Sequence, residues 1–130
     1  MNPKLEGVIF SKAGNLVYRG FYREEDSFDE REGKLYHYHC IDIEDFSYFG
    51  WHEDIEEAYR VAHEAVFESL EDFIRDGEVI YLPKGRLRKK RGSRPVEIEL
   101  TPDHTDLVLD YVEKGGKVLY ACDIASETYY

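Results

Sequence analysis

The stretch that decides the fold is residues 54–77, which read DIEEAYRVAHEAVFESLEDFIRDG. Its apolar residues recur at spacings of three and four, the pattern of an amphipathic helix that buries one side. The stripe contains Ile55, Ala58, Tyr59, Ala62, Ala65, Val66, Ser69, Leu70 and Phe73. Asp54 is placed to cap the first turn with Glu57 completing a capping box, and Gly77 suits the left-handed turn that ends a helix. We therefore predict a helix over residues 54–75.

The segments before this helix are typical of strands. Residues 8–10 and 16–18 flank a turn that contains Gly and Asn, which predicts a hairpin whose second strand runs through residue 22. The acidic stretch that ends at Gly33 is interpreted as a solvated loop. Residues 34–42 and 46–51 are rich in aromatic and branched side chains and predict two further strands. The period of two in the first of these places Leu35, His37, His39 and Ile41 on one face and Tyr36, Tyr38 and Cys40 on the other.

The chain after the helix predicts a short strand over residues 78–82 and then a smaller unit. Its apolar residues Val96, Ile98 and Leu100 alternate with acids, which indicates a half-exposed strand. Thr101 and Pro102 begin a short helix. The apolar side of that helix consists of Leu107, Val108, Tyr111 and Val112, and its end is marked by Gly115 and Gly116. A last strand is predicted over residues 117–122.

These elements predict an α+β protein in which an antiparallel sheet over residues 16–82 carries the long helix on one face, with a C-terminal strand-helix-strand unit added. We expect residues 1–83 to form the main domain and residues 84–95 a basic linker. We expect residues 96–130 to form an extension that packs on the same domain.

Charge is distributed unevenly along this acidic chain. The 130 residues have a formal net charge of −11, which disfavours contact with nucleic acid over most of the surface and favours basic partners. An acidic block is the predicted partner-binding segment and contains Glu24, Glu25, Asp26, Asp29, Glu30 and Glu32. A basic block over residues 84–94 is interpreted first as an exposed linker and second as a contact for nucleic acid or an acidic partner. The candidate nucleic-acid contacts are Arg86, Arg88, Lys89, Lys90 and Arg91.

Aromatic residues make up 15% of the chain, and several are close together in the sequence. One small core does not easily bury so many, so we expect a homo-oligomer with some of them at its interface. The candidate interface residues are Tyr36, Tyr38, Tyr48, Phe49 and Trp51.

The sequence features that bear on localisation favour the cytoplasm. No apolar run approaches the ~20 residues that a membrane-spanning helix needs. Residues 1–6 lack the basic start and apolar stretch of a secretion signal. Cys40 and Cys122 are far apart in the sequence and are interpreted as small buried side chains in a reducing compartment.

No motif of an enzyme is recognisable, and we predict neither catalytic residues nor a cofactor nor a metal. Asp42, Glu44 and Asp45 would be the candidates for a two-metal nuclease, but a solvated turn is the preferred interpretation. His37 and His39 share one strand face, as zinc ligands can, with His52 or Cys122 as guesses for further ligands. We interpret the two histidines instead as half-buried hydrogen-bonding residues.

Part of the sequence resembles the antitoxin domain of the HicB family. The resemblance covers roughly residues 16–83 and is carried by residues 54–58, by Ala62, by Glu64 with Ala65, and by residues 73–80, FIRDGEVI. It implies a partial ribonuclease-H-like fold without catalysis, homo-oligomerisation, and binding to a small basic toxin, HicA, that cleaves RNA. The family's DNA-binding appendage has two helices, and the region from residue 96 predicts only one.

The first functional hypothesis is therefore a non-catalytic, HicB-like antitoxin or an orphan relative that neutralises a small basic protein. The alternative is an acidic inhibitor or adaptor that imitates the charge of a nucleic acid and blocks a nucleic-acid enzyme. A metal-dependent nuclease is the third hypothesis.

Overall fold

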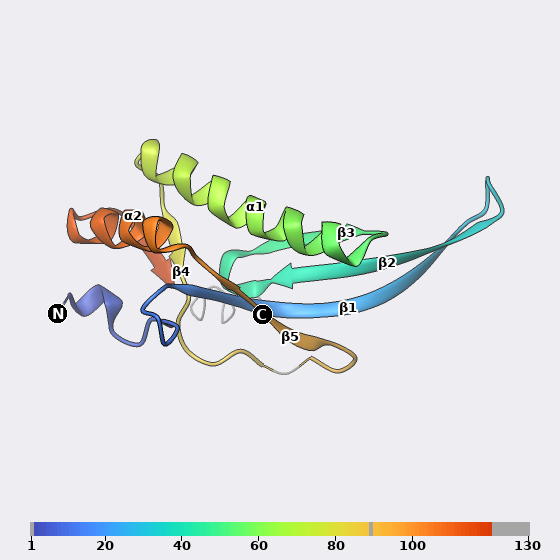
Figure 1. Cartoon of the computed structure of the whole chain (residues 1–130), viewed down its shortest axis with the longest axis horizontal. Helices are drawn as coiled ribbons and strands as arrows, with labels where there is room; N and C mark the ends of the chain where they lie inside the picture. The colour runs from blue at the N-terminus through green and yellow to red at the C-terminus, as the bar shows by residue number, and fades with distance from the viewer. Residues whose placement is uncertain (1, 89, 121–130) are drawn as a thin grey trace.

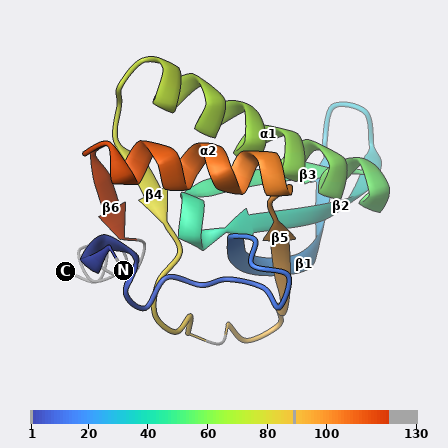
Figure 2. The same ribbon diagram turned by 60° about the vertical axis from the view of Figure 1, so that its left-hand side comes forward.

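A computed structural model describes residues 2–88 and 90–120 of the protein. The fold is α+β, as predicted, and its elements are seen in Figures 1 and 2. The strands are β1 (Val17–Asp29), β2 (Lys34–Ile43), β3 (Tyr48–His52), β4 (Ile80–Leu82), β5 (Arg94–Glu99) and β6 (Val118–Tyr120). The helices are α1 (Ile55–Arg75) and α2 (Pro102–Glu113), with short 3-10 turns η1 (Pro3–Leu5) and η2 (Glu44–Phe46). Among the described residues, neither helix is long and apolar enough to span a membrane.

The main sheet has four strands in the order β3-β2-β1-β5, and every neighbouring pair is antiparallel. β4 was predicted to belong to this sheet, which is wrong, because it pairs in parallel with β6 in a separate two-stranded sheet. The place beside β1 is taken by β5, whose buried Val96 and Ile98 stand opposite Gly20 and Tyr18. The half-exposed strand predicted from the alternation of apolar residues thus completes the main sheet.

α1 lies along one face of the main sheet (Figure 1). Four residues of the predicted stripe are fully or almost fully buried, namely Ala58, Ala62, Val66 and Leu70. The carboxylate of Asp54 accepts the N–H of Glu56 at 2.9 Å, which confirms the predicted cap. The capping box is wrong, because the N–H of Asp54 donates to His52 and the carboxylate of Glu57 binds Arg60.

α2 packs beside α1 and shares its core. The rings of Phe67 in α1 and His104 in α2 stack with their centroids 4.7 Å apart. The predicted cap is confirmed, since Thr101 accepts the N–H of His104 at 3.0 Å. Val108 and Val112 are buried in the same apolar cluster as the residues of β1, α1 and β4. The described elements are therefore stabilised by one continuous core.

The first part of the chain only partly follows the prediction. Phe10 and Leu16 form an isolated antiparallel bridge across the predicted turn, but no regular strand precedes β1 in the described residues. The solvated loop predicted for the acidic stretch is wrong. Residues 24–29 continue β1, each pairs with a residue of β2, and only residues 30–33 form the turn. An acidic segment can form a strand here because both faces of the strand are exposed to water. The peptide groups are paired in the backbone ladder, and no charged side chain has to be buried.

Candidate functional site

The ends of β1 and β2 project beyond the rest of the molecule as a long hairpin (Figure 1). We call residues 24–38 the hairpin arm. Among the described residues, each strand pairs over this range only with the other, because β5 begins at Arg94, opposite Tyr22, and β3 ends at His52, opposite His39. A two-stranded ribbon without a third strand is marginally stable by itself, so the arm depends on its anchorage in the main sheet. Such a projecting ribbon is accessible from both faces.

An apolar pair lies near the end of the arm. Phe28 and Leu35 stand directly opposite each other in the register, and 60% and 63% of their surfaces are exposed. The remainder of the arm is dominated by acidic side chains. The pair was not predicted from the sequence. The signal for it was Phe28, which is the one apolar residue inside the acidic block.

All six predicted partner-binding acids lie on the arm, but on different sides of it. Glu24 and Asp26 share the face that carries α1, and Glu25 lies on the opposite face, where it is 3.6 Å from a guanidinium nitrogen of Arg23. Five of the six side chains are exposed, and Asp29 is half-buried. The arm thus presents negative charge to both sides.

The turn of the arm is organised by two of these acids. One carboxylate oxygen of Asp29 accepts the N–H groups of Arg31 at 2.9 Å and Glu32 at 3.3 Å. The carboxylate of Glu32 accepts a hydrogen bond from the hydroxyl of Tyr36, and Gly33 supplies the positive φ of 63° that the turn needs. These contacts fix the shape of the turn and leave Glu30 exposed.

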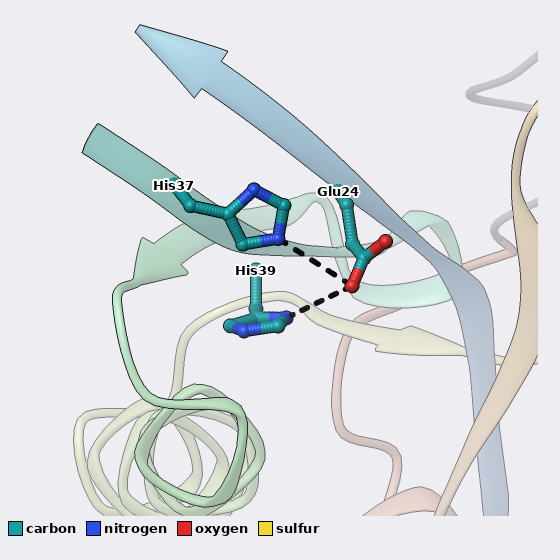
Figure 3. A group of neighbouring side chains, drawn as sticks. All are labelled: Glu24, His37 and His39. Atoms are coloured by element: carbon teal, nitrogen blue, oxygen red, sulfur yellow. Dashed lines mark ion pairs between the residues drawn. The ribbon is translucent and has the colours of Figure 1, made fainter. Parts of the chain in front are cut away.

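The base of the arm holds a cluster of two histidines and one glutamate (Figure 3). Nε2 of His37 and Nδ1 of His39 are 3.5 and 3.8 Å from the same carboxylate oxygen of Glu24. Nδ1 of His37 is hydrogen-bonded to Asp26 at 2.6 Å, and Nδ1 of His39 to the hydroxyl of Tyr22 at 2.5 Å. Hydrogen bonds to Asp26 and Glu24 raise the pKa of His37 above its usual value. The two histidines do form hydrogen bonds, as predicted, although His37 is exposed rather than half-buried.

The sheet face opposite α1 carries aromatic side chains. The rings of Phe49 and Trp51 in β3 have centroids 5.9 Å apart, and those of Tyr36 and Tyr38 in β2 are stacked at 6.1 Å. These four residues, which we call the aromatic face, were predicted at an oligomer interface. The fifth, Tyr48, stands opposite buried Ile43 on the α1 side and packs against the core.

The described bases of the basic segment differ in their surroundings. Lys90 donates to Asp42 at 3.2 Å and also pairs with Glu44, while Arg86 and Arg88 are exposed. Arg91 lines a pocket beneath β1 and β5, together with Phe21, Leu87 and other residues. Lys89 lies outside the described residues.

Each of the three carboxylates considered as nuclease residues is paired with a lysine or arginine side chain. Asp42 and Glu44 hold Lys90, and Asp45 is buried against Arg19. Asp45 accepts both the backbone N–H of Arg19, at 2.8 Å, and its Nε, at 2.7 Å. Burial raises the pKa of Asp45 by more than the hydrogen bonds from Arg19 lower it. This arrangement ties η2 to β1 and differs from the solvated turn that was predicted.

The chain was compared with protein-family models, with curated proteins and with solved structures, and none of them matched. Cys40 is buried and unbridged, and Cys122 lies outside the described residues.

Proposed function

We propose that the protein is a non-catalytic binding module that holds a small basic protein through its hairpin arm. The observation that carries this proposal is the combination of charge and apolar surface on the arm. Residues 24–38 contain six carboxylates but only two lysine or arginine residues, Arg31 and Lys34. The exposed pair Phe28 and Leu35 lies among these charged side chains. Neither feature contributes to the core of the protein itself.

The combination suits recognition of a protein. An apolar contact shielded by charged neighbours supplies affinity, while the surrounding carboxylates raise the association rate with a basic surface and select against acidic ones. A nucleic acid would be repelled by the same carboxylates. The arm therefore favours a partner whose basic surface includes an apolar recess.

The resemblance to HicB antitoxins supports a specific kind of partner. A HicA-type toxin is small and basic and binds RNA, so the arm would cover its RNA-binding surface by charge complementarity. The alternative function, imitation of a nucleic acid against some other nucleic-acid enzyme, requires the same basic surface. The two functions differ in the activity of the partner. The partner of an antitoxin is a small toxin that cleaves RNA, and the partner of a nucleic-acid mimic is some other nucleic-acid enzyme.

The test uses two variants with equal changes in charge. The arm variant carries Glu25→Gln, Glu30→Gln and Glu32→Gln, and spares the acids that touch the histidine cluster. The control carries Glu68→Gln, Asp106→Gln and Glu113→Gln, which are exposed acids of α1 and α2. With the tagged chain as bait in an extract of its native host, the parent and the control should retain a basic protein that the arm variant loses.

The salt dependence and the activity of the recovered protein complete the test. Added salt should reduce the difference between the parent and the arm variant, because it screens exposed charges. The recovered protein should cleave RNA and should be inhibited by the parent chain. Equal retention by the arm variant and the parent would contradict the proposal. Metal-dependent cleavage of RNA or DNA by the chain itself, abolished by Asp42→Asn, would favour the nuclease hypothesis instead.

We also propose that the aromatic face mediates homo-oligomerisation. The supporting observation is that Phe49 and Trp51, which are 47% and 59% exposed, lie in the edge strand β3 beside the stacked tyrosines of β2. Light scattering at high micromolar concentration should give at least the mass of a dimer for the parent and of a monomer for Trp51→Lys. A monomer mass for the parent would exclude this assembly.

A further inference from the structure

We propose that Glu24, His37 and His39 form a binding site for a divalent transition metal of the zinc class. The site lies at the base of the hairpin arm and uses residues of both strands (Figure 3). It shares Glu24 and Asp26 with the acids of the arm but lies away from the apolar pair near the turn, and it does not depend on the proposed partner.

The register of the hairpin brings the three ligands together. His37 and His39 are two residues apart in β2 and therefore share one face, and Glu24 in β1 stands directly opposite His39. The candidate ligand atoms all lie within 4.8 Å of one another, and the two distances to the Glu24 oxygen are 3.5 and 3.8 Å. Ligand atoms of a tetrahedral zinc ion are about 3.3 Å apart, given metal–ligand bonds of roughly 2.0–2.1 Å. Side-chain adjustments of the order of an ångström would therefore close the site.

A fourth residue, Asp26, orients the ring of His37 for metal binding. The carboxylate of Asp26 accepts a hydrogen bond from Nδ1–H of His37 at 2.6 Å. In the neutral ring this leaves the lone pair on Nε2, which is the nitrogen that faces Glu24. A carboxylate on the far nitrogen of a ligating histidine fixes the tautomer and the orientation of the ring, and it increases the basicity of the ligand. Asp26 would be a positioning residue of the site rather than a ligand.

The hydroxyl of Tyr22 competes for one ligand atom. It is hydrogen-bonded to Nδ1 of His39, which the metal would take over. The same hydroxyl is 3.3 Å from a carboxylate oxygen of Glu24 and can donate its hydrogen there. The hydroxyl therefore keeps its hydrogen bond to the carboxylate when the metal takes Nδ1 of His39, and Tyr22 stays beside the site.

The ligand set selects the class of metal. Two imidazoles and one carboxylate suit zinc and neighbouring transition metals, whereas Ca²⁺ and Mg²⁺ require oxygen ligands. Three protein ligands leave a fourth position for water or an external ligand. That position can reach solvent, because the side chains of Glu24 and His37 are 56% and 50% exposed. A bound ion would also cross-link β1 to β2 where the two-stranded ribbon begins.

The test measures metal binding by the full chain. Titration calorimetry with Zn²⁺ should give saturable binding by the parent, and Co²⁺ should give the visible absorption of a low-symmetry site. His37→Ala should weaken zinc binding by at least ~100-fold, more than the 10–100-fold typical of losing an outer-shell partner, and Asp26→Asn should fall within that smaller range. The matched control is His63→Ala, which removes a histidine of α1 whose ring is hydrogen-bonded to the carbonyl of Tyr59.

A second measurement guards against misfolded variants. Circular dichroism should show the parent fold for His37→Ala, since that side chain is exposed. Zinc should raise the unfolding temperature of the parent and of His63→Ala, but not that of His37→Ala, because a ligand stabilises only the state that binds it. Equal zinc affinity of His37→Ala and the parent, or no saturable binding by the parent, would overturn the proposal.

Discussion

The two halves of β1 belong to the same strand but are held in place by different means. Residues 17–22 lie between α1 and the basic segment, and Val17, Tyr18, Phe21 and Tyr22 are buried there. From residue 23 onward the strand pairs, within the part of the chain that the structure describes, with β2 alone, and its side chains from residue 24 to residue 28 are exposed. The first half is fixed by the core, and the second by its backbone ladder and by polar contacts at the surface.

The same contrast is seen in two arginines four residues apart on one side of the strand. Arg19 is 16% exposed and makes several hydrogen bonds to the buried carboxylate of Asp45. Arg23 is 38% exposed and lies 3.6 Å from the exposed carboxylate of Glu25. The half of β1 that stabilises the protein and the half that is available for binding are therefore separable by mutation.

The largest effect is expected from a charge placed under the helix that covers the first half. Ala62→Asp should unfold the protein, since a buried, unpaired carboxylate costs more than ~4 kcal/mol, which is comparable to the stability of a small domain. The control is Val61→Asp, whose side chain is 37% exposed on the same helix. Far-ultraviolet circular dichroism with thermal melting checks both variants. An Ala62→Asp variant that melts like the parent would show that this side of α1 is misassigned.

An intermediate effect is expected from the buried ion pair. Arg19→Met leaves Asp45 buried without its cation and should cost about 3 kcal/mol near neutral pH. Arg23→Met, the matched change in the exposed half, should cost less than about 0.5 kcal/mol. Urea unfolding of the two variants beside the parent measures the difference. Similar losses for both would contradict the division of β1 into two halves.

The cost of Arg19→Met should depend on pH. Burial already raises the pKa of Asp45 above its usual 3.8, and loss of the arginine raises it further. The protonated carboxyl is neutral and tolerates burial, so the penalty is absent below pH 3.8 and develops as the pH rises through the raised value. The difference in unfolding free energy between the variant and the parent should therefore shrink as the pH is lowered towards 4. A constant difference would show that Asp45 is not the group involved.

The smallest effect on stability is expected at the end of the arm. The double variant Phe28→Ala, Leu35→Ala should change the unfolding free energy by no more than about 0.5 kcal/mol, because both side chains are exposed. Phe21→Ala, in the buried half, should cost about 3 kcal/mol. The double variant should nevertheless lose the basic partner retained by the parent. Full retention of the partner, or a loss of stability like that of Phe21→Ala, would place the apolar pair in a structural role.

How far the candidate site could be foreseen depends on how local its contacts are. The shared face of His37 and His39 follows from the period of two in one strand, and the sequence predicted it. The approach of Glu24 could not be predicted, because it requires the register of β1 against β2, and the acidic block was interpreted as a loop. The separation of Tyr48 from Phe49 and Trp51 follows from the period of two within β3, but which of the two sides faces α1 is decided by the pairing of β3 with β2.

The sequence by itself determined α1, its Asp54 cap, its buried stripe and the helix that begins after Thr101. Helix periodicity and capping depend on residues within one or two turns of each other, so a single segment contains the information. The tertiary structure alone decided that β5 completes the main sheet, that β4 pairs with β6, and that the acidic residues extend β1 into a projecting arm. Strand pairing joins residues far apart in the chain, and its register depends on the partner strand as much as on the strand itself.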